Sequence, residues 1–183
     1  MKTLAEQIGQ TPHLSPLLRK LRKVGLIFPD DLRRLAVARG CDHYRQSDDL
    51  SKSFDSGSEQ ISNLELAIAM VTAAQDFDPV LVRCAAQLLS GEDISAESIA
   101  RLAVLERAVL VVRHIARAGL EMDAQGHDKW RRLLEILPSA PEVAEGRLPH
   151  RTRFVSQSGL LRVNGRIERG ERSIWLRPII KEK

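Results

Sequence analysis

The chain has 183 residues, of which 43% are hydrophobic, 28% are charged and 4% are aromatic. This composition fits a globular domain with an aliphatic core, and the presence of only two cysteines excludes a disulfide framework. The longest aliphatic runs are far shorter than the ~20 residues of a membrane-spanning helix, so we expect no contact with a membrane.

The formal net charge of +4 is unevenly distributed along the chain. Residues 1–46 carry a net charge of +5, residues 47–146 carry −8, and residues 147–183 carry +7. Two basic ends therefore flank an acidic middle. This pattern indicates either a partner of opposite charge or neutralisation within one fold or one oligomer.

The two cysteines, Cys41 and Cys84, are typical of a reducing compartment, where a free thiol behaves as a small hydrophobic side chain. The first residues contain no apolar stretch of the kind that forms the centre of a signal peptide. We therefore expect a cytoplasmic protein.

Two short amphipathic helices are predicted near the N-terminus, over residues 15–26 and 28–40. Ser15 followed by Pro16 is a typical helix start, and Gly40 is expected to end the second helix. The two helices would form a helical hairpin or a helix-turn-helix-like pair, with basic residues lying off the apolar stripe. These basic residues are Arg19, Lys20, Arg22, Lys23, Arg33 and Arg34.

Residues 44–61 interrupt the hydrophobic periodicity and are rich in serine and aspartate. Such a composition predicts a loop or linker, which at this length is either disordered or functional. We expect limited proteolysis to cleave this segment before it cleaves within residues 95–119.

Four further helices are predicted over residues 62–75, 78–91, 95–119 and 127–138. The segment 95–119 is apolar on several faces, so it is expected to be one long central helix. Capping residues precede the first three helices, namely Ser62, Asp78 and Ser95. The apolar stripe of the long helix is formed by Leu102, Leu105, Val109, Val112 and Ala116.

After a proline-rich connector over residues 138–151, the hydrophobic period changes from helical spacing to alternation. Residues 159–178 then predict a β-hairpin, and residues 151–157 can add a third strand. A turn at residues 164–165 would mix apolar and charged residues on each face. A turn around residues 170–171 separates them cleanly, so we favour the second register.

In the favoured register, the outer face of the hairpin combines three arginines with one tryptophan. Arginine offers a rigid fork of donors to phosphate, and an indole ring offers a plane on which a base can stack. Alternatively, the charges only protect an exposed sheet edge, and the indole packs on the helical body. The predicted nucleic-acid contacts are Arg162, Arg166, Trp175 and Arg177, with Arg19, Lys20, Arg22 and Lys23 as phosphate-binding residues near the N-terminus.

Two groups of residues have the composition of a metal site. Asp76 and Asp78 have a spacing that suits a hard metal ion, but Asp78 is already explained as a helix cap. Cys41 and His43 could bind zinc together with Cys84, but no fourth ligand is evident. We therefore predict no metal and no cofactor.

His114 lies in the predicted long helix among three arginines, Arg107, Arg113 and Arg117. The histidine can act as an acid or base, but in such a position it is more often a polar residue at the rim of a helix. The arginines could hold an acidic ligand or pair with acidic residues of the chain. No phosphate-binding loop, metalloprotease motif or nucleophile elbow is present, so we predict no catalytic residue.

The sequence thus predicts a mainly helical protein, with a compact bundle of five to six helices and a small C-terminal antiparallel β-hairpin or three-stranded sheet. We divide the chain into a basic helical pair (1–43), a linker or loop (44–61), a helical core (62–138) and a connector with a basic β element (139–183).

The predicted function is non-catalytic binding of nucleic acid in the cytoplasm, by a regulator or by a subunit of a nucleoprotein complex. The alternative is a protein-interaction adaptor that uses the acidic helical core or an exposed strand edge. An enzyme such as a nuclease is the third hypothesis. Oligomerisation is compatible with each of them.

Overall fold

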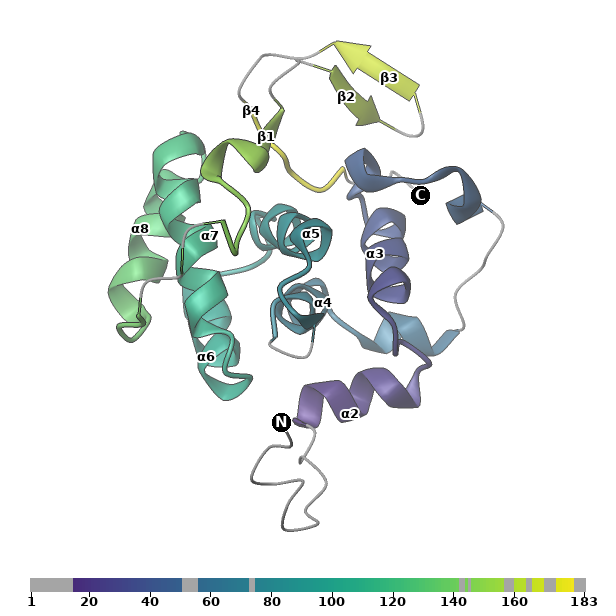
Figure 1. Cartoon of the computed structure of the whole chain (residues 1–183), viewed down its shortest axis with the longest axis horizontal. Helices are drawn as coiled ribbons and strands as arrows, with labels where there is room; N and C mark the ends of the chain where they lie inside the picture. The colour runs from purple at the N-terminus through teal and green to yellow at the C-terminus, as the bar shows by residue number, and fades with distance from the viewer. Residues whose placement is uncertain are drawn as a thin grey trace.

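The chain forms a bundle of seven α-helices, with four short strands in two two-stranded antiparallel sheets, in the part that the structure describes. The strands lie together at one end of the bundle (Figure 1). The predicted mainly helical fold with a small C-terminal β element is therefore confirmed. The structure is a computed structural model that describes residues 15–50, 56–72, 75–141, 144, 146–156, 160–163, 166–169 and 174–179.

All of these elements are short. The helices are α2 (Pro16–Lys23), α3 (Pro29–Ala38), α4 (Asn63–Met70), α5 (Pro79–Leu89), α6 (Ala96–Leu105), α7 (Val109–Met122) and α8 (His127–Ile136). The strands are β1 (Val155–Ser156), β2 (Leu160–Val163), β3 (Arg166–Arg169) and β4 (Ile174–Trp175). Single 3₁₀ turns lie between them, namely η1 (Asp42–Tyr44), η2 (Ser47–Leu50), η3 (Ser56–Gln60) and η5 (Arg151–Arg153).

Side-chain caps start the helices where the sequence predicts them. Ser62 Oγ accepts a hydrogen bond from Glu65 N (3.1 Å), and Glu65 Oε2 accepts one from Ser62 N (2.8 Å). Asp78 Oδ1 accepts hydrogen bonds from two backbone N–H groups of α5, at 2.7 and 3.0 Å. Ser15 and Ser95 also cap their helices, whereas α3 begins after Phe28, so Asp30, which the sequence indicates as its cap, lies inside the first turn.

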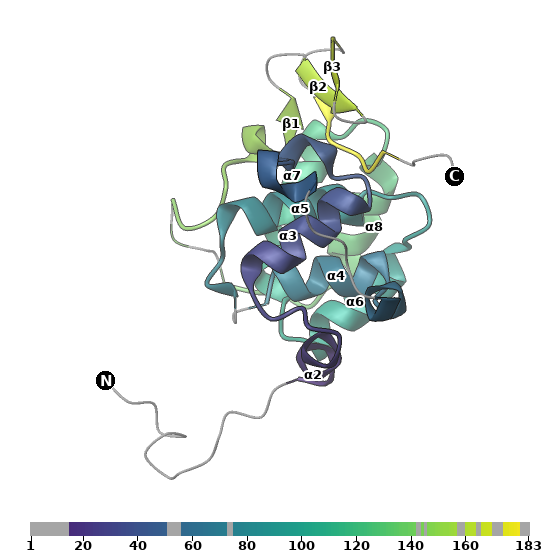
Figure 2. The same cartoon turned by 90° about the vertical axis from the view of Figure 1, so that its right-hand side faces the viewer.

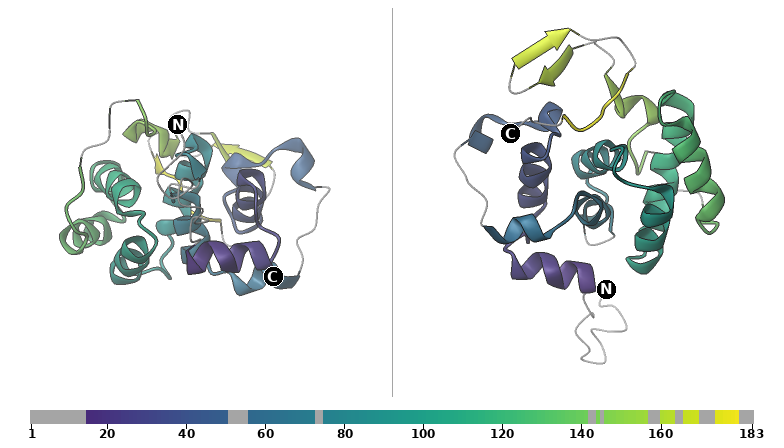
Figure 3. Two further views of the ribbon diagram at one scale, coloured as in Figure 1. Left: turned by 60° about the horizontal axis from the view of Figure 1, so that its bottom comes forward. Right: turned by 180° about the vertical axis from the view of Figure 1, so that it is seen from behind.

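Helices α4 and α5 form the centre of the bundle. The consecutive residues Leu66 to Met70 are all apolar, so this part of α4 has no polar face. A helix that is apolar on all sides is expected in the core, and these five residues are all buried. Helices α2 and α3 lie on one side of this pair, while α6, α7 and α8 lie on the other (Figures 1 and 3). The core is mainly aliphatic, and its largest fully buried side chains are Trp130 and Phe154.

Residues 95–119 belong to two helices, so the prediction of one long helix is wrong. Arg107 has a φ of 56°, and Ala108 N donates a hydrogen bond to Ala103 O (2.8 Å). This arrangement is a Schellman motif, in which a residue in the left-handed conformation ends the helix. That position is usually glycine, and here it is arginine. The sequence therefore contains no helix-breaking residue that would indicate the turn.

The turn between α6 and α7 moves part of the predicted apolar stripe to the surface. Leu105 is the last residue of α6 and is 63% exposed, so the prediction that it is buried is wrong. Leu102 and Val109 are half-buried, whereas Val112 and Ala116 in α7 are buried as predicted. The fully buried part of the predicted stripe is therefore confined to α7.

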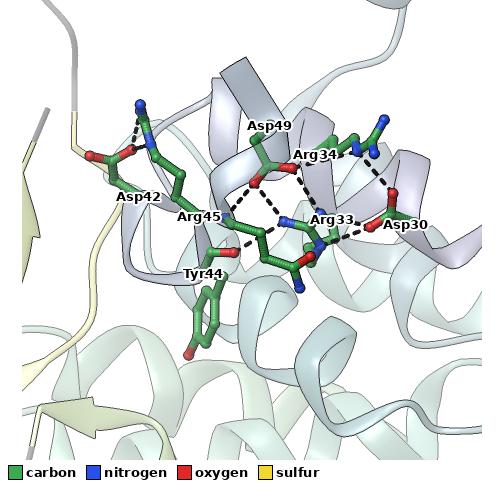
Figure 4. Close-up of polar contacts among 8 residues, drawn as sticks. Asp30, Arg33, Arg34, Asp42, Tyr44, Arg45 and Asp49 are labelled. Carbon is green, nitrogen blue, oxygen red and sulfur yellow. Dashed lines mark hydrogen bonds and ion pairs between the residues drawn. The ribbon is translucent and has the colours of Figure 1, made fainter. Parts of the chain in front are cut away.

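The Ser- and Asp-rich segment 44–61 is tied to α3 by a network of charged residues (Figure 4). Arg33 is 4% exposed, and its Nη1 and Nη2 atoms donate to the two carboxylate oxygens of Asp49, at 2.7 and 2.8 Å. The same guanidinium donates to Asp30 and to the carbonyl oxygen of Tyr44. The hydrogen bonds from Arg33 lower the pKa of Asp49. The described parts of this segment are therefore attached to the helical pair.

Strands β1 and β4 attach the C-terminal segment to the bundle. They pair antiparallel, with Val155 opposite Trp175. Beyond β4 the chain continues along the bundle, and Ile179 N donates a hydrogen bond to Gly40 O (3.0 Å). The third strand expected over residues 151–157 is therefore present as β1, and its partner is β4.

Strands β2 and β3 form a hairpin connected through residues 164–165, because Val163 pairs with Arg166. The register favoured from the sequence, with a turn around residues 170–171, is wrong. That register would give the hairpin one buried face, but the hairpin projects from the bundle and Ile167 is 67% exposed (Figures 1 and 2). The observed register is the one that the Asn-Gly sequence at residues 164–165 favours, and the described side chains of β3, at Arg166, Ile167 and Arg169, are exposed.

Candidate functional site

The predicted nucleic-acid contacts fall into two groups at opposite ends of the molecule. One group belongs to β2, β3, β4 and the residues after β4, and the other belongs to α2 (Figures 1 and 2). The helical bundle lies between them, so the structure does not bring the two groups together. The first group is Arg162, Arg166, Trp175 and Arg177, and the second is Arg19, Lys20, Arg22 and Lys23.

Trp175 is buried against the bundle. It is 4% exposed, and its ring stacks on Phe154 with 5.5 Å between the ring centroids. The ring of Trp130 is tilted against the Trp175 ring, with a centroid distance of 5.6 Å. The prediction of an exposed indole plane is therefore wrong. The alternative, in which the indole packs on the helical body, is confirmed.

Arg177 anchors the C-terminal segment to the bundle. Its Nη2 donates to Asp123 Oδ1 (2.6 Å), and its Nη1 donates to Ser90 O (2.7 Å). Ser90 is the C-terminal cap of α5, where the helix dipole favours a positive charge. Two donors of the Arg177 guanidinium are therefore used within the fold.

The other two predicted residues of this end belong to the hairpin itself. Arg166 is exposed, as predicted, and Arg162 lies in β2 opposite Ile167, while its side chain lies outside what the structure describes. Exposed cations and exposed apolar residues occur together here. The cations are Arg153, Arg166 and Arg169, and the apolar residues are Leu160, Ile167 and Ile174.

Helix α2 presents three exposed cations on one side. Arg19, Arg22 and Lys23 have i, i+3 and i+4 spacing, which places them on one face of a helix. The opposite face is formed by Leu17 and Leu21, which are buried in the core. Within the described part of the chain, the three cations form no ion pair. We call Arg19, Arg22 and Lys23 the α2 basic face.

The fourth cation of α2 is neutralised within the protein. Lys20 Nζ donates to both carboxylate oxygens of Glu65, at 2.7 and 2.8 Å, and so joins α2 to α4. The other basic residues of this region also bind groups of the protein itself, namely Arg33, Arg34, Arg39 and Arg45. The α2 basic face is therefore the part of the N-terminal positive charge that has no internal partner among the described residues.

The turn after α2 exposes two large apolar side chains that sequence reasoning did not single out. Ile27 is 51% exposed and Phe28 is 65% exposed. Phe28 directly precedes Pro29, the first residue of α3, so it lies outside the buried stripe of either helix. The sequence does carry a signal for this, because a residue before proline is held in an extended conformation and off the helix.

The possible metal ligands do not gather into one site among the described residues, although Cys41 Sγ lies 3.8 Å from Cys84 O. Asp78 is the cap of α5, as expected. Cys41 and Cys84 are buried, and burial raises the pKa of both thiols, whereas His43 is exposed. In the described ranges, no group of three or more His, Cys, Asp or Glu residues is placed to hold a metal ion.

His114, Arg113 and Arg117 lie on the wall of a cavity between α7 and the segment that precedes η5. Arg107 does not join them, because it lies in the turn before α7. The sequence therefore identified one side of this cavity, but the residues on the other side are distant in the chain.

No protein-family model, no curated protein sequence and no solved structure matches the chain. Among the described residues, every helix is too short or too polar to cross a bilayer.

Proposed function

We propose that this protein is a non-catalytic, cytoplasmic nucleic-acid-binding protein that contacts phosphates through the α2 basic face. The observation that carries the proposal is the position of Arg19, Arg22 and Lys23. The three cations project from one side of a helix whose other side is buried, and no carboxylate within the described residues neutralises them. Such cations supply the salt-dependent attraction that dominates binding to a phosphate backbone.

A purely structural role accounts for only part of this arrangement. Arg22 and Lys23 lie in the last turn of α2, where positive charge complements the helix dipole. This effect is worth about 0.3–1 kcal/mol at an exposed site. It falls off within the last turn, so it does not explain Arg19, which lies one turn earlier.

The exposed Phe28 gives the proposed contact a preference for single strands. Phe28 follows Lys23 by five residues in the chain, and an exposed aromatic ring can stack on an unpaired base, which adds about 1–3 kcal/mol per base. A duplex offers no free base plane to the ring. We therefore expect a single-stranded oligonucleotide to bind at least as tightly as a duplex of equal length.

The proposal is tested by fluorescence anisotropy with labelled single-stranded and duplex oligonucleotides over a range of salt concentrations. The variant Arg19→Gln/Arg22→Gln/Lys23→Gln keeps polarity and most of the bulk but removes three positive charges. We expect weaker binding, and a dependence of log K on log salt that is flatter by up to ~2–3 units, about one for each lost phosphate contact. Far-UV circular dichroism checks that the variant is folded.

A matched control removes the same charge from the opposite end of the molecule. The variant Arg153→Gln/Arg166→Gln/Arg169→Gln changes three exposed arginines near the hairpin. We expect it to keep most of the affinity and the salt dependence of the parent protein. If only this control variant loses binding, the contact lies at the hairpin end, and the proposed role of α2 is refuted.

A protein-interaction adaptor is the second candidate, favoured by a different observation. Leu160, Ile167 and Ile174 are 48%, 67% and 42% exposed at the hairpin end. Within the described residues, β2 and β3 pair only with each other, so the outer edge of β3 has no strand partner and can accept a strand from another protein. A parent protein that binds neither oligonucleotide at low salt would favour this candidate.

A further inference from the structure

The outer edge of β3 faces away from the helical bundle. Strand β2 packs against η1 and pairs with β3, so β3 is the strand of the hairpin that lies farther from the bundle (Figures 1 and 2). Hydrogen bonds alternate along an antiparallel pair, so every second residue of β3 points its N–H and C=O groups away from β2. No other described strand pairs with these groups. They can therefore bind an added strand.

The described side chains of β3 carry a pattern that an added strand would meet. Ile167 is 67% exposed, and Arg166 and Arg169 are also exposed. Among the described residues, neither arginine forms an ion pair. Side chains alternate between the two faces of a strand, so Ile167 and Arg169 share one face and Arg166 lies on the other. The edge thus presents one apolar position between two cations at a fixed spacing.

The charge of this end of the chain favours one kind of added strand. Residues 147–183 carry a net charge of +7, with all of their glutamates counted. Arg151 and Arg177 pair with carboxylates of the bundle, and without these two arginines the net charge is +5. A second copy of the chain would bring the same positive charge to the edge, and like charges oppose strand pairing. An acidic strand brings the opposite charge, so it is the favoured occupant.

We propose that the outer edge of β3 binds an extended acidic segment of a partner protein as an added antiparallel strand. An apolar residue of the partner lies opposite Ile167, and an aspartate or glutamate lies opposite each of Arg166 and Arg169. Residue 168 is a glutamate in the sequence, so a neutral residue suits the position opposite it. Because the two strands run in opposite directions, Glu-Thr-Val-Glu is a partner sequence of this kind.

This proposal rests on the second candidate function and is independent of the α2 basic face. Backbone hydrogen bonds supply affinity in strand addition, and the side chains that face each other across the two strands supply specificity. A guanidinium group is a suitable donor to a carboxylate, and a β-branched residue suits a strand. Affinity should therefore depend both on the backbone N–H groups of the partner and on the order of its residues.

The probe is a fluorescein-labelled peptide with blocked ends and the sequence Thr-Glu-Thr-Val-Glu-Thr, titrated with the full chain and followed by fluorescence anisotropy. We expect saturable binding of one peptide per chain. The scrambled peptide Thr-Val-Glu-Glu-Thr-Thr has the same charge and composition, but no register places its two acids opposite both arginines. It should bind about tenfold more weakly, because up to three cross-strand pairs are lost.

A second control peptide tests the backbone. N-methylation of the adjacent threonine and valine at the centre of the probe keeps its charge and its residue order. One of any two adjacent N–H groups in an added strand faces β3, so the modified peptide cannot form the full ladder of hydrogen bonds. We expect its binding to be at least about tenfold weaker than that of the probe.

A charge exchange locates the contact on β3. Arg166→Glu/Arg169→Glu should lose the acidic probe and should bind Thr-Lys-Thr-Val-Lys-Thr instead, while far-UV circular dichroism checks that it is folded. Arg101→Glu/Arg107→Glu changes two exposed arginines at the other side of the bundle and should bind the acidic probe within about twofold of the parent protein. Arg19→Gln/Arg22→Gln/Lys23→Gln should also bind it normally, which separates this test from that of the α2 basic face.

Three results would overturn the proposal. The first is the absence of saturable binding of the acidic probe. If the parent protein then self-associates and Ile167→Asp abolishes the association, the edge binds a second copy instead. The second is equal binding of the scrambled or the N-methylated peptide, which would mean that charge alone attracts the probe. The third is a variant Arg166→Glu/Arg169→Glu that still prefers the acidic peptide, because the probe would then bind elsewhere.

Discussion

At the scale of single residues, the C-terminal end of α5 shows how two half-buried cations are held by backbone carbonyl groups. Lys129 Nζ donates to Leu89 O (2.6 Å) and Gly91 O (2.8 Å), while Arg177 Nη1 donates to Ser90 O (2.7 Å). Carbonyl oxygens at a helix end lack partners within the helix, and the dipole there attracts positive charge. Burial, with a smaller contribution from Arg177, lowers the pKa of Lys129 to about 8.

This lowered pKa predicts a pH dependence of stability. Between about pH 8 and pH 10.5, the unfolded chain keeps the proton on Lys129 while the folded chain has released it. Because the unfolded state binds more protons in this window, Lys129 makes the free energy of unfolding rise with pH. Urea unfolding at pH 7.5 and pH 10 should show that the parent protein gains stability relative to Lys129→Gln. An equal difference at the two pH values would contradict the lowered pKa.

Local sequence motifs predicted the roles of residues whose partners are close in the chain. Ser62 and Glu65 are three positions apart, so a capping box is visible without any knowledge of the fold. Trp175 and Arg177 were misplaced for the opposite reason. Their partners include Phe154 and Asp123, and no spacing rule connects positions so distant.

At the scale of elements, the turn between α6 and α7 shows that hydrophobic periodicity predicts helical structure here but not the place where one helix ends and the next begins. Helical spacing continues through residues 95–119, and no glycine or proline interrupts it. The helix nevertheless ends at Arg107, and Ala103 and Ala108 on the two sides of the turn are both buried in the core. Packing therefore outweighs the conformational cost of a left-handed arginine, about 1–2 kcal/mol.

The turn predicts a sharp contrast between two leucine-sized side chains. Leu105 is 63% exposed and Ile115 is 0% exposed. Leu105→Ala should change the free energy of unfolding by less than about 1 kcal/mol, whereas Ile115→Ala should cost about 2–5 kcal/mol. Chemical denaturation of the two variants under one set of conditions checks this. A large loss in Leu105→Ala would mean that α6 and α7 form one continuous buried helix.

At the scale of the whole molecule, the turn after α3 and the C-terminal segment support each other. Ile179 N donates to Gly40 O, and Gln87 Nε2 donates to Arg177 O (2.6 Å). Gly40 has a φ of 103°, and a Cβ atom there would lie 2.5 Å from Ile179 O. The sequence predicted Gly40 as a helix stop, but only the fold shows that this position also contacts the segment after β4, where a Cβ atom would clash.

Two glycines allow this contact to be tested. Gly40 and Gly25 both have positive φ, but a Cβ atom at Gly25 would meet nothing within 4 Å. Gly25→Ala therefore measures backbone strain alone, about 1–2 kcal/mol. Gly40→Ala should cost at least about 1 kcal/mol more, because the clash also breaks the hydrogen bond from Ile179. Thermal unfolding measures the difference, and equal losses would show that residue 179 does not pack on residue 40.

The contact between Gly40 and Ile179 has a consequence for synthesis of the protein. About 140 residues separate the two positions, which a ribosome translating about 5–20 residues per second adds in on the order of ten seconds. During that time the nascent chain can form α2 to α5. Asp123 can pair with Arg177, and Trp130 can contact Trp175, only after these later residues have been synthesised. A nascent chain that has not reached residue 177 keeps the hydrogen bond from Trp130 Nε1 to Asp123, but it lacks the aromatic cover of Trp175 and the arginine partner of the carboxylate, and chaperones bind apolar surface that is exposed in this way.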